Sequence, residues 1–327
     1  MYDIVTFGEA MLRLSPPDFK RLEQATSFDV FVGGGELNVA VAAARMGKKA
    51  AWISKLPDGP TGRLIRNKAR EWGVCTDHVV WSKEGRAGIY FMEFGAAPRA
   101  SSVLYDRANS SISLIKQREV DWNAVLEGVK VFHVSGITPA LSKSAAEVTF
   151  EALRAARRKG ALVSYDLNYR AKLWTEEEAQ KCQEPMMEFV DVLISTEEDT
   201  NRVFKISAPT YNEVAEKLAK KFNFKAVAIT LRDTPSVWKN TWTAIAYSDG
   251  KFYADKTYDV EIVDRVGSGD SFTAGFLIGY LEQGVEYGVK LGNALAALKH
   301  SIPGDLPIVT RDEVENVMKK GGLRISR

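Results

Sequence analysis

The chain has little of what marks several large classes of protein. It holds only two cysteines, Cys75 and Cys182, and their separation matches no metal-binding or redox spacing. Such isolated thiols are typical of structural residues in a reducing compartment, so we expect a cytoplasmic location. With 44 Lys and Arg against 42 Asp and Glu, the net charge of +2 gives no field that would attract nucleic acid or an anionic membrane.

Long apolar runs are also missing. The most apolar segment, residues 272–281, is far shorter than the ~20 residues that a bilayer span needs. The N-terminus carries Asp3 with no long apolar stretch behind it, which is typical of a strand rather than of a signal peptide. We therefore expect a soluble protein that binds neither membranes nor nucleic acid.

The sequence does contain a regular alternation of apolar β-type runs and helical patterns. It predicts strands at 4–7, 50–54, 129–134, 161–165, 192–194 and 226–231. It predicts helices at 37–45, 61–72, 144–159, 176–189, 197–204, 211–222, 271–282, 285–299 and 311–319. Strands bracketed by helices indicate a mostly parallel sheet covered on both faces. No linker or repeat divides the chain, so we expect one domain over residues 1–327.

Two segments, at about 10–32 and 87–107, interrupt this alternation. Each contains a pair of short apolar runs with no helix between them, and we expect them to pair as an antiparallel outgrowth. The outgrowth is either a lid over a binding crevice or an edge hairpin without function. Its apolar residues Ile89, Phe91 and Phe94 would gain from pairing with another subunit, so we expect a homo-oligomer that forms through the lid.

The most informative stretch is 264–270, Asp-Arg-Val-Gly-Ser-Gly-Asp, directly before an amphipathic helix. Glycines at a helix N-terminus leave main-chain N–H groups free to hold an anion. Asp270 repels an anion, so it makes sense there as a base that deprotonates an attacking hydroxyl while the amides hold a phosphoryl group. The simpler alternative is a helix cap, but a cap alone does not require the flanking Gly267 and Gly269.

The loop matches neither a Walker A sequence nor a dinucleotide fingerprint. It resembles instead the C-terminal signature of the ribokinase-like (PfkB) sugar kinases, and residues 33–40, Gly-Gly-Gly-Glu-Leu-Asn-Val-Ala, resemble their N-terminal signature. The resemblance implies a three-layer α/β/α sandwich with a mostly parallel sheet and a small β lid, and ATP with Mg²⁺ as phosphoryl donor. It also implies Asp270 as catalytic base, residues Gly267, Ser268 and Gly269 as the anion hole, and a monovalent cation such as K⁺ near Asp264.

Candidate sugar-binding residues lie near the N-terminus. Gly33 and Gly34 allow close approach to the backbone, although they are equally a strand-to-helix turn, and the Asn38 amide can both donate to and accept from hydroxyls. Glu9 takes the place where family members often carry an aspartate that binds sugar hydroxyls, or else it is a solvated acid at a strand edge.

Arginines suggest that the substrate is acidic. Arg170 follows a predicted strand at the sheet edge where such folds bind ligands, and Arg107 lies on the lid with Tyr90 and Tyr105. A substrate carboxylate accepts charge-assisted hydrogen bonds from the planar guanidinium group, whereas a neutral hexose has no negative charge to offer it. Alternatively, Arg107 pairs at the surface with Asp106 or Glu93. The set is similar to that of 2-keto-3-deoxygluconate kinases within the family; a fructokinase or nucleoside kinase, or a non-catalytic sugar sensor, stays the alternative.

The resemblance also points to a nucleotide side. Thr230 matches a threonine that faces the phosphates, and Arg232 replaces the family's glycine there. Thr196 and Asp199 stand in an altered metal-associated motif, where Asp199 would hold Mg²⁺ through water or simply belong to an acidic helix start. On a late helix, Asn293 and Ala297 share the face that flanks adenine in the family, and core packing is the other role for Ala297.

Overall fold

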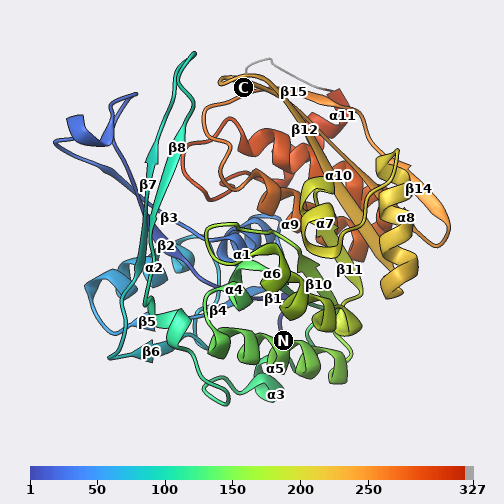
Figure 1. The fold of residues 1–327 in the computed structure, drawn as a ribbon, viewed down its shortest axis with the longest axis horizontal. Coiled ribbons are helices and arrows are strands. Elements are labelled where there is room, and N and C mark those ends of the chain that lie inside the picture. Colours follow the sequence, from blue (N-terminus) through green and yellow to red (C-terminus); the bar gives the residue numbers. More distant parts are fainter. Residues whose placement is uncertain (321–327) are drawn as a thin grey trace.

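The computed structural model describes residues 1–320, and a two-sided sheet is its centre (Figure 1). The strand β1 (Ile4–Phe7) shows why: all four residues are buried, and Ile4 and Val5 belong to different apolar clusters. Because successive side chains of a strand point to opposite faces, a continuous apolar run requires cover on both sides.

The central sheet is parallel at one end and antiparallel at the other. Neighbouring strands run parallel from β4 to β12, and β12, β13 and β14 are antiparallel, with β15 also paired to β13. Its path is β14 (Lys251–Ala254), β13 (Lys239–Ser248), β12 (Ala226–Ser236), β11 (Val192–Ser195), β10 (Leu162–Asp166), β9 (Val131–Ser135), β1 and β4 (Ala50–Ile53), with β15 (Tyr258–Glu261) beside it.

Helices form a layer on each face of this sheet. One apolar cluster contains α1 (Gly35–Arg45), α2 (Pro60–Glu71), α9 (Ser268–Gln283), α10 (Val285–Lys299) and α11 (Arg311–Lys320). The other contains α3 (Trp122–Val125), α5 (Lys143–Arg158), α6 (Glu176–Gln183), α7 (Glu197–Phe204) and α8 (Tyr211–Phe222). The expected α/β/α sandwich is therefore confirmed. Over residues 1–320, no helix has both the length and the apolarity that a membrane crossing demands.

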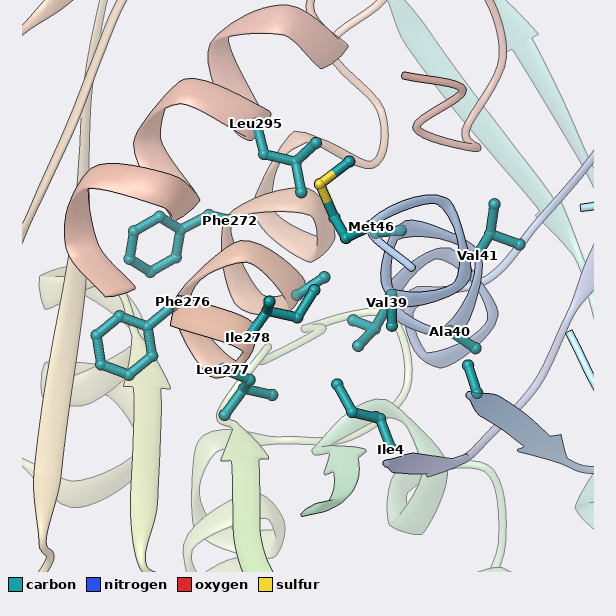
Figure 2. Packing of buried hydrophobic residues seen from close by; sticks show 14 of the residues in the cluster. Ile4, Val39, Ala40, Val41, Met46, Phe272, Phe276, Leu277, Ile278 and Leu295 are labelled. Atoms are coloured by element: carbon teal, nitrogen blue, oxygen red, sulfur yellow. The ribbon is translucent and has the colours of Figure 1, made fainter. Parts of the chain in front are cut away.

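Glycines bring α9 and α10 into backbone contact. A Cβ on Gly275 would lie 2.7 Å from the Cα of Gly292, and one on Gly279 would lie 2.6 Å from the Cα of Gly288. In Figure 2 the rings of Phe272 and Phe276 lie on the side of α9 that faces away from α1, and Phe272 is close to Trp242 of β13. This close packing leaves the N-terminus of α9 little freedom to move.

A second, smaller sheet stands to one side of the sandwich (Figure 1), and we call it the lid. Its order is β3 (Asp29–Gly33), β2 (Met11–Ser15), β7 (Gly88–Glu93) and β8 (Ser102–Asp106), so it is built from the two segments expected. The outer pairs are antiparallel, but β2 and β7 are parallel, and the expectation of a purely antiparallel outgrowth is wrong there. The intervening chain includes α1 and α2, which is long enough for a crossover.

Two other stretches differ from the sequence prediction. The strand expected at 226–231 continues to Ser236 and turns into the long hairpin β12–β13, which the alternation pattern did not indicate. The helix expected at 176–189 ends at Gln183 and becomes the 3₁₀ helix η3 (Glu184–Phe189), because Pro185 cannot continue an α-helical hydrogen-bond ladder. The remaining elements are short: η1 (Leu22–Gln24), β5 (Lys55–Pro57), β6 (Val80–Ser82), η2 (Ser111–Leu114) and α4 (Ile137–Ala140).

Candidate active site

The loop 264–270 forms a main-chain cradle at the start of α9. Gly267 is the N-cap with φ of 86°, and a Cβ there would lie 2.1 Å from the carbonyl oxygen of Asp305. The Ser268 hydroxyl donates to Arg265 O at 2.9 Å and is buried. The N–H groups of Gly269 and Asp270 bond to no other described residue, so they are free to hold an anion.

Asp270 lies in the first turn of α9 and is brought together with Asn38 of α1. The Asn38 Nδ2 donates to Asp270 Oδ2 at 2.7 Å, while its Oδ1 accepts from the N–H of Gly34 at 3.3 Å. Burial raises the pKa of Asp270 to about 7, against the hydrogen bond from Asn38 and with a further upward contribution from Glu36. A carboxyl with this pKa exchanges a proton readily near neutrality.

Further carboxylates gather at the end of β10 and the start of α7. Burial, together with the charges of Asp270 and Asp199, raises the pKa of Asp166 well above its usual value. Burial likewise raises the pKa of Asp199, and Arg170 opposes the rise in both. The exposed Arg170 guanidinium donates to Tyr169 O at 3.0 Å and forms no ion pair with another described residue. It is therefore available to a ligand.

These carboxylates fit the magnesium ion that the family resemblance implies. Asp166 and Asp199 form an excess of negative charge, and Mg²⁺ needs only one or two carboxylates because it keeps water and takes phosphate oxygens. Within residues 1–320 no cluster of three or more His, Cys, Asp or Glu could hold a metal by itself. The Thr196 hydroxyl accepts from Asp199 N at 3.1 Å and caps α7, and its own hydrogen donates to no other described residue.

The inner face of the lid carries Arg107 in an ion pair with Glu9. The surface pairings with Asp106 or Glu93 are absent, because those acids pair with other arginines. The Glu9 Oε1 and the Arg107 Nε are buried and have no hydrogen-bond partner among the described residues. The ion pair therefore carries one unpartnered acceptor and one unpartnered donor, and these would suit the hydroxyls of a ligand. The Tyr105 ring lies 5.5 Å from the Arg107 guanidinium.

An arginine that the sequence analysis missed connects the lid to the cradle. Arg13 of β2 is fully buried, with its guanidinium 2.7 Å from Asp264 Oδ2 and 3.0 Å from Asp305 Oδ1. The Tyr90 hydroxyl donates to the other oxygen of Asp305, so this tyrosine already has a partner inside the protein. Arg13 lies on a strand between two leucines, and a charge inside an apolar run is the signal that could have revealed it.

The glycines expected to admit the sugar lie against the protein itself. A Cβ on Gly33 would be 2.1 Å from Asp305 Oδ2, and one on Gly34 would be 1.9 Å from Glu9 O. Their first role is to let the chain pass from β3 into α1 in close contact with Asp305 and Glu9. Asp305 was not singled out from the sequence, although it touches both Gly33 and Gly267.

On the nucleotide side, positive charge gathers beside the cradle. Burial and the charge of Arg232 lower the pKa of Arg265, so the two guanidinium groups lie close enough to repel each other. Neither forms an ion pair within the described part of the chain, and an anion between them would relieve the repulsion. Thr230 lies on β12 two residues before Arg232 and is half-buried.

The candidate residues Asn293 and Ala297 on the late helix α10 are buried, as is His300 at its end. Asn293 is fully buried, donates to Asp255 Oδ2 at 3.5 Å and has an Oδ1 with no partner among the described residues. Ala297 is 8% exposed and packs mainly as core. His300 is the C-cap of α10 and is buried, with burial lowering its pKa to about 4.

Comparisons with known proteins identify the family of this chain. The profile of the pfkB family of carbohydrate kinases matches residues 1–307. A 2-dehydro-3-deoxygalactonokinase from Haloferax volcanii is 40% identical, over 99% of both chains. The crystal structure of a 2-dehydro-3-deoxygluconokinase from Thermotoga maritima is 45% identical with a TM-score of 0.94, covering 96% of this chain and 97% of that one.

A more distant structure shares the fold alone. The fructokinase from Xylella fastidiosa, solved with bound ATP, is 23% identical with a TM-score of 0.82, over 98% of this chain and 99% of that one. Taken with the lid, the cradle and Asp270, the family match over nearly the whole length shows that this chain belongs to the pfkB family of carbohydrate kinases.

Proposed function

We propose that the protein transfers the terminal phosphoryl group of ATP to the terminal hydroxyl of 2-keto-3-deoxygluconate, which gives 2-keto-3-deoxy-6-phosphogluconate and ADP. The observation that carries the proposal is the Asp270 carboxylate, held by Asn38 at 2.7 Å beside the free amides of the cradle. The substrate class follows the two relatives that are 40% and 45% identical, which act on 2-dehydro-3-deoxy sugar acids.

In the proposed reaction, Asp270 accepts the proton of the sugar hydroxyl as its oxygen attacks the terminal phosphorus. The bond from that phosphorus to the bridging oxygen breaks, and ADP leaves with the electron pair. The amides of Gly269 and Asp270 donate to the phosphoryl oxygens, where negative charge is held during transfer. Arg232 and Arg265 would hold the polyphosphate, and Asp199 with Asp166 would hold Mg²⁺, which when bound would supply positive charge against the phosphates.

The sugar acid lies in this proposal between Arg170 and the lid. Arg170 pairs with the substrate carboxylate, because its guanidinium has no acidic partner of its own among residues 1–320. The Arg107–Glu9 pair binds hydroxyls, since each member keeps one unpartnered polar atom. Tyr105 lines the pocket beside them, and Gly33 and Gly34 shape its floor. A fructokinase is the alternative, and it would make no use of Arg170.

Replacing Asp270 with Asn tests the base. We expect kcat to fall by roughly 10²–10⁴-fold with KM little changed, since the amide keeps the shape of the carboxylate but accepts no proton. An ADP-release assay coupled to NADH oxidation measures both constants. Asp312→Asn in the first turn of α11 is the matched control, because that aspartate is exposed and has no ion pair with another described residue, so kcat should not change.

The pH profile provides a second readout of the same residue. Because a base works only when deprotonated and the pKa of Asp270 is about 7, turnover should rise from acid pH and level off above neutrality. Asn38→Ala removes the hydrogen bond that lowers this pKa, so the rise should move to higher pH. A flat profile in the wild type, or unaltered turnover with Asn at 270, would refute the assignment.

Arg170→Ala separates a sugar acid from a neutral sugar. A charge-assisted hydrogen bond contributes about 1.5–3 kcal/mol, so KM for 2-keto-3-deoxygluconate should rise about 10- to 100-fold. Residual turnover of fructose should not change. The control is Arg66→Ala on α2, where the guanidinium bonds only to Asn67. A KM that stays unchanged for both sugars in Arg170→Ala would favour the fructokinase alternative. Assays with both C4 epimers of the acid decide between gluconate and galactonate.

We also propose that the lid joins two copies of this chain. On the face opposite Arg13, the side chains of Val30, Leu14, Phe91 and Leu104 form a row across all four strands. Val30 is 52% exposed and Leu104 is 56% exposed. Such a row is an apolar patch that a second lid would cover. Phe94, in contrast, lies 5.3 Å from the Arg13 guanidinium on the inner face.

The double variant Val30→Lys/Leu104→Lys tests this surface. Sedimentation velocity should show a dimer or larger assembly for the wild type and a monomer for the variant, because two charges on the row oppose burial. Leu64→Lys on α2, where the leucine is 41% exposed, is the control and should not alter the assembly. A monomeric wild type at micromolar concentration would rule the surface out.

A further inference from the structure

A buried lysine next to the cradle has no role in the chemistry described so far. Lys299 ends α10 and is fully buried, which is rare for a lysine. Its ammonium donates to two main-chain carbonyls, Asp264 O at 3.1 Å and Ile302 O at 2.9 Å. Asp264 opens the cradle loop, and Ile302 belongs to the segment that leads to Asp305. The ammonium thus joins the two segments that shape the cradle.

The monovalent cation implied by the family resemblance was expected at this place, and the residues present do not fit it. Both carboxylate oxygens of Asp264 are engaged, with Oδ1 accepting from Val266 N at 3.0 Å and Oδ2 from Gly304 N at 2.9 Å beside Arg13. The Asp264 carbonyl is taken by Lys299. Carbonyl oxygens are the ligands that a potassium ion takes in proteins, and here an ammonium group already holds them.

We infer that Lys299 is a built-in replacement for the monovalent cation, so that this enzyme holds its cradle in shape without K⁺. An ammonium group carries the same charge as K⁺ and is close to it in size. Because the group is tethered to α10, its local concentration does not depend on the solution. The surrounding charges support a cation at this point, since the charges of Asp264, Asp305 and Asp270 raise the pKa of Lys299, and that of Arg13 lowers it.

The state of the lysine is consistent with this role. Burial lowers the pKa of Lys299 to about 8, and the charges of Asp264 and Asp305 oppose the decrease. At neutral pH most molecules therefore keep the ammonium charged. Without the lysine side chain, the two buried carbonyls would lose this donor, which destabilises the fold.

The test compares the wild type with Lys299→Ala and Lys299→Met in KCl, NH₄Cl or choline chloride at equal ionic strength. The Tm and kcat of the wild type should be the same in all three salts. Lys299→Ala leaves a space for a cation, so K⁺ or NH₄⁺ should raise its lowered Tm by about 2 °C over choline and restore turnover. Lys299→Met fills the space without a charge and should show no such response.

The Tm measurement keeps this inference separate from the proposed kinase activity on which it rests. A failure of the substrate assignment would abolish turnover but leave the salt response of the Tm intact. The inference is overturned if K⁺ raises the Tm or the kcat of the wild type above the choline value. It is equally overturned if Lys299→Ala folds and responds to neither cation, and where that variant does not fold, the wild-type comparison alone decides.

Discussion

The side chain of Arg13 lies between two buried carboxylates, one at the start of the cradle loop and one just after α10. The arginine comes from the lid, whereas Asp264 and Asp305 come from the sandwich. The ion pairs therefore hold the lid against the sandwich. Removing a charge from such a buried group is costly, about 3–5 kcal/mol, because its partners stay uncompensated. The position of the lid and the shape of the cradle therefore depend on the same side chain.

Around the site, acidic and basic side chains form separate groups. Arg13 and Lys299 compensate Asp264 and Asp305. Asp166 at the end of β10 and Asp199 in α7 form no ion pair with another described residue, and the charge of Arg170 compensates them in part, which leaves negative charge that a metal ion would neutralise. Arg232 and Arg265 leave positive charge on the other side. In the function that we propose, a polyphosphate with its metal would lie between the acidic and the basic group, and the hydroxyl to be phosphorylated would meet Asp270 there.

Local patterns in the sequence predicted much of this, and long-range pairs escaped it. The run of apolar residues before each helix predicted the parallel strands, and the glycines around Asp270 predicted the cradle, because both depend on neighbouring residues. Arg13 and Asp305 are 292 residues apart, and no local pattern predicts that they touch. The parallel pairing of β2 with β7 and the hairpin after Leu231 were missed for the same reason, since register is set by the partner strand.

Amide hydrogen exchange on Arg13→Met, beside the control Arg66→Met on α2, tests most directly whether lid and cradle form one unit. The account predicts that exchange accelerates together in β2 and in residues 264–270, while β9 and β10 in the centre of the sheet keep their protection. Faster exchange in β2 alone, with the cradle unchanged, would contradict it.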